Sequence, residues 1–267
     1  MQTMIETKDH TFAYPAEEGE EPRAALKDVN VSIERGSFVV VLGHNGSGKS
    51  TLAKHMNAVL LPSGGAVYVE GMDTRDEACL LEIRRRVGMV FQNPGMSFNP
   101  IRKIGAQFLE ALKNHGKIDE SQATKQILDM FTRLGLREGK RILNSYPFEL
   151  SGGMNQRVGI CISMLQHPSL LLADEPTSAL DVIVQKQVVE EMLLLRQEYH
   201  TAMIIVTHNI GVVGKMADKV LVLKNGKVME YGDTRQVLDD PQDPFTKELM
   251  NSVPRLNRGK LESICTG

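Results

Sequence analysis

A glycine-rich segment near residue 45 has the residue types and spacing of a phosphate-binding loop. Residues 43–50 read GHNGSGKS, which fits the pattern G-x-x-x-x-G-K-S/T. Glycines let the backbone curl so that successive N–H groups point inward at a phosphate chain. An apolar, β-branched stretch precedes the loop and a helical stretch follows it, which is the context this motif requires. A chance glycine turn is the alternative interpretation.

Two side chains of this loop could act on a nucleotide directly. Lys49 can bridge the β- and γ-phosphates, and the hydroxyl of Ser50 can ligate Mg²⁺. The start of the following helix adds a partial positive charge. We therefore expect a nucleoside triphosphate and Mg²⁺ as cofactors, with the nucleotide bound by Gly43, Asn45, Gly46, Ser47, Gly48, Lys49, Ser50 and Thr51.

A pair of carboxylates follows a second apolar strand. Residues 170–175 read LLLADE, so Asp174 and Glu175 stand at the end of this strand. In enzymes with a phosphate loop, such an aspartate holds Mg²⁺ and a neighbouring carboxylate can polarise the attacking water. Two solvated acids at a strand end are the alternative, which the nearby phosphate loop makes the weaker interpretation.

A third segment could bind an anion at the start of a helix. Residues 150–153 read LSGG, and a helical stretch follows at once. Taken alone, Ser151 is better interpreted as a simple N-cap whose hydroxyl accepts a hydrogen bond from the first turn.

Composition restricts the class of protein. The chain has 267 residues, of which 42% are hydrophobic and 24% charged, which suits one elaborated domain or a domain with a subdomain. With 31 basic and 33 acidic residues the net charge is −2, so no global field attracts nucleic acid and we expect no nucleic-acid partner.

The cysteines and the apolar segments suggest where the protein works. Cys79, Cys161 and Cys265 are far apart and form no C-x-x-C pair, which indicates reduced thiols in a cytosolic protein. The polar N-terminus does not have the pattern of a signal peptide, and no apolar run approaches the roughly 18 residues of a membrane span. If the protein acts at a membrane, we therefore expect it to act through a partner protein.

Strand and helix patterns alternate along most of the chain. Strands are predicted at 24–33, 38–42, 66–70, 87–91, 170–173, 203–206, 220–224 and 227–231. Helices are predicted at 49–60, 103–115, 121–134, 152–166, 182–199 and 245–251. The expected fold is α/β, with a mostly parallel sheet flanked by helices, an N-terminal antiparallel β-subdomain and an inserted helical subdomain.

The change of pattern along the chain suggests a division of one domain, residues 1–267. Residues 1–92 and 159–240 would form the nucleotide-binding core with its β-subdomain. Residues 93–158 would form the helical subdomain, and 241–267 a C-terminal tail.

Together, these segments resemble the ATP-binding subunits of ABC transporters, which have a P-loop NTPase core. The phosphate loop, Gln92, the LSGG segment, the LLLADE segment, SALD at 178–181 and His208 follow in the order and spacing of that family over nearly the whole chain. The resemblance implies ATP hydrolysis that powers an importer. It also implies a homo- or heterodimer with a second such subunit, membrane permease partners, and a peripheral position on the cytoplasmic membrane face.

The resemblance also implies roles for single residues around the nucleotide. Tyr14 is similar to the aromatic residue that stacks on adenine, and Gln92 to the glutamine that senses Mg²⁺ and water and contacts the membrane partner. His208 is similar to the histidine that clamps the γ-phosphate and positions Glu175. The alternatives are that Tyr14 only covers a strand end, that His208 is a satisfied polar residue, and that Gln92 is an ordinary surface residue.

Two further segments would act across a dimer. Ser151, Gly152 and Gly153 resemble the signature that contacts the γ-phosphate of the opposite subunit, and Asp181 resembles the dimer-contact loop, although it too is a common surface type. Met154 stands where this family usually has glutamine, which would alter only the start of the helix.

The two parts of the chain resemble different branches of the family. Up to about residue 91, TFAYP at 11–15 and the segment 41–65 are similar to energy-coupling-factor importers. Beyond it, MSFNP at 96–100 and the segments 146–158 and 243–256 are similar to oligopeptide and nickel importers. We therefore hypothesise a composite, natural or engineered, joined near Gln92. With Cys265 alone near the end, we predict no iron–sulfur cluster.

Two rivals to an importer subunit remain at this point. One is an ABC ATPase that serves DNA repair or translation, although such chains usually have long coiled-coil insertions or two cassettes. The other is a composite that folds and binds nucleotide but lacks a matched membrane partner.

Overall fold

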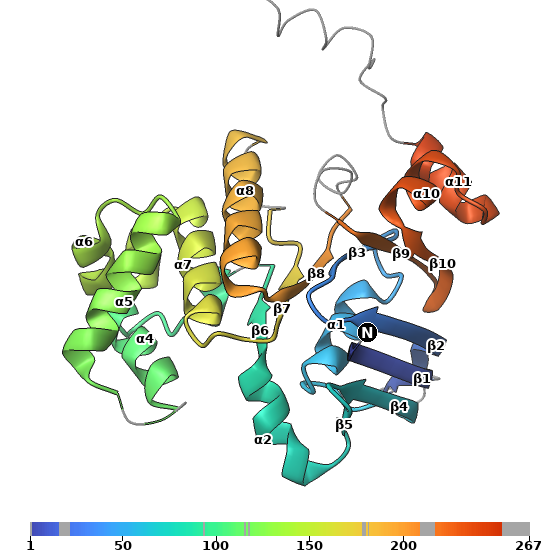
Figure 1. The fold of residues 1–267 in the computed structure, drawn as a ribbon, viewed down its shortest axis with the longest axis horizontal. Coiled ribbons are helices and arrows are strands. Elements are labelled where there is room, and N and C mark those ends of the chain that lie inside the picture. Colours follow the sequence, from blue (N-terminus) through green and yellow to red (C-terminus); the bar gives the residue numbers. More distant parts are fainter. Residues whose placement is uncertain are drawn as a thin grey trace, which may run out of the picture.

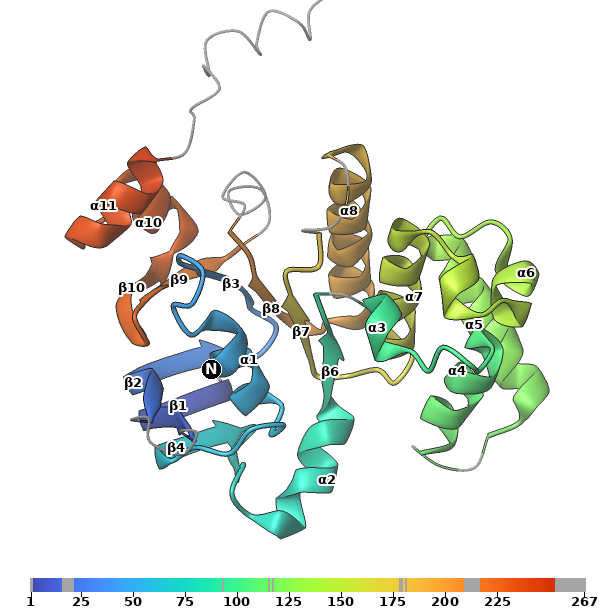
Figure 2. The same ribbon diagram turned by 180° about the vertical axis from the view of Figure 1, so that it is seen from behind.

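The computed structural model describes residues 2–15, 22–92, 94–114, 116, 118–177, 180, 182–208 and 217–252. Two sheets and a group of helices make up this part of the chain (Figures 1 and 2). The predicted α/β class, with two sheets and a separate group of helices, is confirmed.

The larger sheet has six strands in the order β10-β9-β3-β8-β7-β6. Their bounds are β3 (Phe38–Leu42), β6 (Val87–Val90), β7 (Leu170–Asp174), β8 (Ala202–Val206), β9 (Lys219–Lys224) and β10 (Lys227–Asp233). Neighbouring strands from β9 to β6 are parallel, whereas β10 returns antiparallel to β9. Asn225 and Gly226, both at positive φ, make the hairpin turn that the sequence predicts.

The central strand β3 is buried on both faces because its side chains alternate between two cores. Phe38, Val40 and Leu42 join the core on the helical side, whereas Val39 and Val41 join the core on the other side. All five residues of β3 are buried. A strand with no solvent face has a continuous apolar sequence, and this explains why residues 38–42 predict the strand correctly.

The smaller sheet is antiparallel and has the order β2-β1-β4-β5. Its bounds are β1 (Thr3–Tyr14), β2 (Arg23–Glu34), β4 (Gly64–Val69) and β5 (Met72–Asp73). Helix α1 (Lys49–Met56) contacts β2 and β4 of this sheet and β7 and β8 of the larger one, so it lies between the two (Figure 1). The phosphate-loop segment, which leads from β3 into α1, therefore lies where the two sheets meet.

A group of helices lies on the opposite side of the larger sheet from β1 and β2 (Figures 1 and 2). It comprises α3 (Pro94–Ser97), α4 (Ile104–Lys113), α5 (Glu120–Arg133), α6 (Gly139–Asn144), the 3-10 turn η1 (Pro147–Glu149) and α7 (Gly152–Met164). Phe108 and Phe131 meet edge to face in its core, with ring centroids 5.4 Å apart. Helix α8 (Val182–Tyr199) packs against α7 and has the predicted bounds.

Several helices differ from the predictions. Helix α1 ends at Met56 rather than near Leu60, because Ala58 adopts a positive φ and the N–H groups of Val59 and Leu60 turn back to the carbonyl of Lys54. Helices α2 (Glu77–Arg86), α6 and α10 (Thr234–Asp239) were not predicted. In α2 only Ile83 is fully buried, so an apolar period was too weak to detect.

The last described helix is α11 (Pro244–Asn251), which starts one residue before the predicted helix. In the described part of the chain, every helix is too short or too polar to cross a membrane.

Candidate functional site

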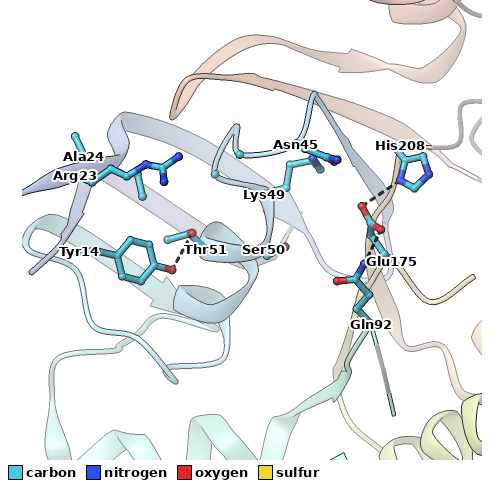
Figure 3. Close-up of a pocket in the computed structure, with 13 residues that line it drawn as sticks. Tyr14, Arg23, Ala24, Asn45, Lys49, Ser50, Thr51, Gln92, Glu175 and His208 are labelled. Carbon is cyan, nitrogen blue, oxygen red and sulfur yellow. Dashed lines mark hydrogen bonds and ion pairs between the residues drawn. The ribbon is translucent and has the colours of Figure 1, made fainter. Parts of the chain in front are cut away.

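A cavity of about 490 Å³ opens where the phosphate-loop segment faces the ends of β1 and β2 (Figure 3). Most of the nucleotide-binding residues predicted from the sequence meet here. The lining residues are Tyr14, Arg23, Ala24, Ala25, Asn45, Gly46, Gly48, Lys49, Ser50, Thr51, Gln92, Glu175 and His208.

Two glycines of the loop are required by their surroundings. Gly43 has φ +151°, and a Cβ there would lie 2.2 Å from the carbonyl oxygen of Leu223. Gly48 has φ +103°, and its Cβ would lie 2.6 Å from the carbonyl oxygen of Ala25. Strand β9 on one side and β2 on the other thus press directly on the loop backbone, and any larger residue would displace it.

The ammonium group of Lys49 is held inside the loop. Its Nζ donates hydrogen bonds to the carbonyl oxygens of Gly43 and His44, each at 2.9 Å. Burial lowers the pKa of Lys49, and the charges of Glu175 and Asp174 offset this only in part. The Oγ of Ser47 is also buried, and no described group bonds it. A phosphate would give both side chains a partner of the right charge.

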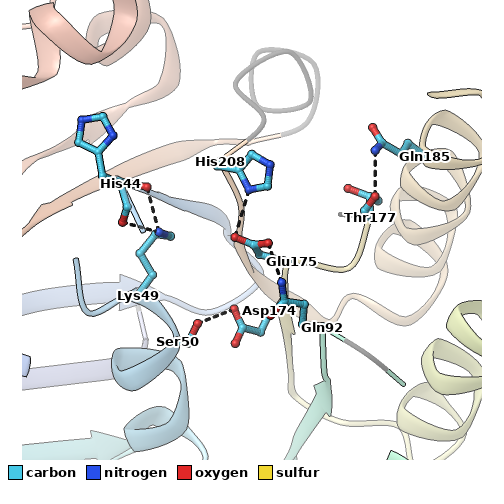
Figure 4. A network of polar contacts seen from close by, with 10 residues as sticks. His44, Lys49, Ser50, Gln92, Asp174, Glu175, Thr177, Gln185 and His208 are labelled. Atoms are coloured by element: carbon cyan, nitrogen blue, oxygen red, sulfur yellow. Dashed lines mark hydrogen bonds and ion pairs between the residues drawn. The ribbon is translucent and has the colours of Figure 1, made fainter. Parts of the chain in front are cut away.

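The first turn of helix α1 contacts the end of β7. Ser50 Oγ donates a hydrogen bond of 2.9 Å to Asp174 Oδ1. Burial raises the pKa of Asp174, against the opposing effects of Ser50 and of Lys54 and Lys49. A hydroxyl and a carboxylate oxygen are therefore adjacent beside the loop, as predicted from the sequence (Figure 4).

Glu175 contacts the two other residues predicted to be catalytic, Gln92 and His208. Gln92 Nε2 donates to Glu175 Oε2 at 3.1 Å, and His208 Nδ1 lies 3.1 Å from Glu175 Oε1 (Figure 4). The Glu175 backbone has φ +47°, and its N–H donates to the carbonyl of Val206. Positive φ is uncommon outside glycine, so the turn after β7 is held by its surroundings rather than by its own preference.

The far end of the cavity carries the aromatic residue. Tyr14 ends β1 and is 37% exposed, and its hydroxyl lies 3.1 Å from Thr51 Oγ1. The ring of Phe12 meets it edge to face at 5.0 Å. One flank of the tyrosine is thus supported, while its ring remains accessible.

Three lining residues were missed by the sequence interpretation: Arg23, Ala24 and Ala25. Arg23 begins β2, and its Nη2 would lie 3.8 Å from a Cβ placed on Gly46. Within the described chain, no hydrogen bond or ion pair engages this guanidinium. No motif marks these residues, because their place depends on the packing of β2 against the loop.

The LSGG segment lies outside this cavity. Ser151 caps α7, with its Oγ accepting a hydrogen bond of 3.3 Å from the N–H of Met154. A Cβ on Gly152 would meet nothing within 4 Å, whereas one on Gly153 would lie 3.2 Å from Val184. The capping role of Ser151 is therefore present, and the segment is not among the residues that line the cavity beside its own loop. Asp181, together with Ser178 and Ala179, lies outside the described residues.

Comparison with known proteins identifies the family. The family model described as ABC transporter matches residues 26–178, more than half of the chain. The chain belongs to the ABC transporter family. It is an ATP-hydrolysing subunit of the importer type, and it binds ATP.

Individual ABC relatives support this placement. The oligopeptide transport ATP-binding protein OppD of Haemophilus influenzae is 39% identical over 91% of this chain and 76% of its own length. A dimeric ATP-binding cassette in a post-hydrolysis state, bound to ADP and Pi, is 32% identical with a TM-score of 0.78, covering 87% of this chain and 99% of its own. The cbiO1 structure from Clostridium perfringens, part of the ABC transporter complex cbiONQ, is 25% identical with a TM-score of 0.77, covering 96% and 97%.

Proposed function

We propose that this ABC subunit powers the import of oligopeptides, through a catalytic centre in which Glu175 orients the attacking water. The observation that carries the proposal is the junction of Gln92, Glu175 and His208 beside the phosphate loop. The peptide substrate is taken from the relatives, which are named as oligopeptide transport proteins.

ATP would enter the cavity with its phosphates on the loop. The backbone N–H groups from Gly46 to Ser50 and the start of α1 would bind the phosphate oxygens. Lys49 would exchange carbonyl partners for the β- and γ-phosphates. The accessible ring of Tyr14 would stack on the adenine, and the guanidinium of Arg23 would reach the phosphates from β2.

The residues beside the loop fit a magnesium ion. Ser50 and Asp174 present adjacent oxygen atoms, and Gln92 can supply an amide oxygen from the other side. These are the hard oxygen donors that Mg²⁺ prefers, with water and phosphate completing its shell. When bound, the ion would neutralise charge on the β- and γ-phosphates.

Hydrolysis would follow from the position of Glu175. Its carboxylate would accept a hydrogen bond from water and orient it for in-line attack on the γ-phosphorus. His208 would hold Glu175 and contact the γ-phosphate, while Gln92 would respond to the water and the permease. Lys49 and the loop N–H groups would stabilise the charge that develops on the γ-phosphoryl oxygens and on the leaving ADP.

A second subunit would complete the site. Ser151 to Gly153 lies outside the cavity of its own chain, so it would contact the γ-phosphate of the partner, aided by the segment around Asp181. A two-fold, isologous dimer would then enclose two ATP molecules. Closure on ATP and opening after hydrolysis would drive the transporter.

The permease would attach beside Gln92, on the cytoplasmic membrane face. A groove of about 510 Å³ includes Phe91, the residue before Gln92, in its lining. Phe98 and Ile162 also line this groove. We propose that residues 93–158 act as a helical unit that forms this groove together with the core of residues 1–92 and 159–240, with 241–267 as the tail.

We also propose that the chain is a composite joined near Gln92. Its support is the mixed resemblance of the two parts to importer branches. Comparing residues 1–92 and 93–267 separately tests this origin. The first part should favour energy-coupling-factor ATPases, and a preference of both parts for oligopeptide importers would refute it.

The steady-state ATPase rate against protein concentration tests the proposed function. A rate per subunit that rises with concentration, and is lost in Glu175→Gln, supports an ATP-enclosing dimer. A rate independent of concentration would reject the shared site. Stimulation by DNA would instead favour a soluble non-transport ATPase, and ATP binding without turnover would favour a composite lacking its partner.

A further inference from the structure

The C-terminal helix contacts the phosphate loop through one aromatic ring. Phe245, in the first turn of α11, is 5% exposed and meets the ring of His44 at a centroid distance of 5.3 Å and an angle of 70°. Lys224 Nζ, at the end of β9, lies 4.2 Å from the centroid of the same Phe245 ring. A residue 201 positions after His44 in the sequence thus covers part of the loop.

His44 connects this contact to the lysine of the loop. The carbonyl oxygen of His44 is one of the two that accept hydrogen bonds from Lys49 Nζ. Movement of the His44 side chain would therefore shift an acceptor that positions the ammonium group. Leu42, which leads into the loop, belongs to the same apolar core as Phe245.

The position of Phe245 is fixed by the structure that precedes it. Asp243 caps α11 by accepting hydrogen bonds from the N–H groups of Phe245 and Thr246, at 2.8 and 3.2 Å. Glu230 of β10 in turn accepts bonds from the N–H groups of Gln242 and Asp243. The ring is therefore presented by a tethered helix rather than by a loose tail.

We propose that Phe245 is a positioning residue for nucleotide binding, which makes the C-terminal helix a determinant of ATP affinity. By packing on His44 it holds the phosphate loop in the shape that receives the triphosphate. This inference rests on the proposed function, because it assigns a further residue to the same nucleotide site.

Affinity for a fluorescent ATP analogue, measured on the full chain, tests the proposal. Phe245→Ala and His44→Ala are each expected to raise Kd by about 3- to 10-fold, the effect of losing one aromatic contact. The Kd of the double variant should not exceed the higher of the two single-variant Kd values, because both substitutions remove the same contact. At saturating ATP, kcat should stay within about twofold while KM rises, and Phe245→Tyr should restore the wild-type Kd.

Leu249→Ala is the matched control. Leu249 is 9% exposed in the same helix and the same core. Its loss should lower the melting temperature without changing Kd. An unchanged Kd in Phe245→Ala, additive effects in the double variant, or an equal rise in Leu249→Ala would each overturn the proposal. If Phe245→Ala does not fold, Phe245→Leu and His44→Ala carry the same comparison. Failure of the wild-type chain to bind ATP would instead refute the proposed function.

Discussion

At the scale of single residues, Glu175 is the carboxylate that we propose to orient the attacking water. Replacing it by glutamine keeps its size and removes its negative charge. We expect Glu175→Gln to retain ATP affinity and to lower turnover by about 10²- to 10⁴-fold, the usual contribution of a positioned base. Paired measurements of Kd and steady-state phosphate release check this. Glu77→Gln, on the exposed start of α2, is the control, and full activity in Glu175→Gln would remove it from the mechanism.

Arg23 offers a second test at this scale, since its guanidinium faces the loop without a described partner. We expect Arg23→Ala to raise the Kd for ATP by about 5- to 10-fold, close to 1 kcal/mol for an exposed charge-assisted contact. Arg23→Lys should recover part of the loss. Titrations at two salt concentrations should show a weaker salt dependence in Arg23→Ala. Lys27→Ala, an exposed cation on the same strand, should change neither value.

At the scale of elements, two glycines with the same φ allow the cost of backbone strain to be distinguished from the cost of a steric clash. Gly36 and Gly65 both have φ +71°, but a Cβ on Gly36 would meet nothing within 4 Å, whereas one on Gly65 would lie 2.2 Å from the carbonyl oxygen of Asp9. Gly36→Ala should cost about 1 kcal/mol of stability. Gly65→Ala should cost roughly 1–3 kcal/mol more, because β1 must move away from β4.

Urea unfolding of both variants gives the comparison, with the free energy of unfolding read at equal m-value. Equal losses for the two variants would show that β1 yields to the added methyl group without cost.

The elements also show where sequence patterns succeed and fail. The loop of residues 43–50 and the strand at 38–42 are local patterns, so their types and neighbours predict them. The sequence did not predict α2, because this helix buries only one side chain fully. It did not predict Arg23 as a lining residue, because the position of Arg23 depends on how β2 lies against the loop. The contact of Phe245 with His44 joins distant segments, which no local pattern records.

At the scale of the whole molecule, a pair of buried histidines lies between the two sheets. His10 of β1 and His55 of α1 are both 0% exposed, with ring centroids 4.5 Å apart. Burial, and then the neighbouring His55, lowers the pKa of His10 to about 3. Burial also lowers the pKa of His55, against a hydrogen bond with the carbonyl of Thr51. Protonation of either ring therefore destabilises the folded state.

Stability should fall as the pH drops below about 6.5, where the unfolded chain binds these protons and the folded chain does not. The loss is about 1.4 kcal/mol per pH unit for each histidine with a strongly lowered pKa. Above about pH 6.5 their contribution is constant. Urea unfolding at about pH 7.5, 6.5 and 5.5 measures the slope, which His10→Leu should reduce by about 1 kcal/mol per unit. His200→Asn, at an exposed position, should leave it unchanged, and an unchanged slope in His10→Leu would contradict the assignment.

The positive φ of Glu175 implies that catalytic activity and thermal stability favour different residues at this position. Glycine adopts this backbone angle without cost, so a chain with Glu175→Gly should shed strain of about 1 kcal/mol at the turn after β7. That chain would lack the carboxylate that we propose to orient water, and its melting temperature should be at least as high as that of the wild-type chain. A melting temperature below that of the parent would show that the bonds to Gln92 and His208 outweigh the strain. If the strain outweighs those bonds, thermal stability alone would favour glycine at position 175, and the glutamate would be explained by its proposed task in hydrolysis.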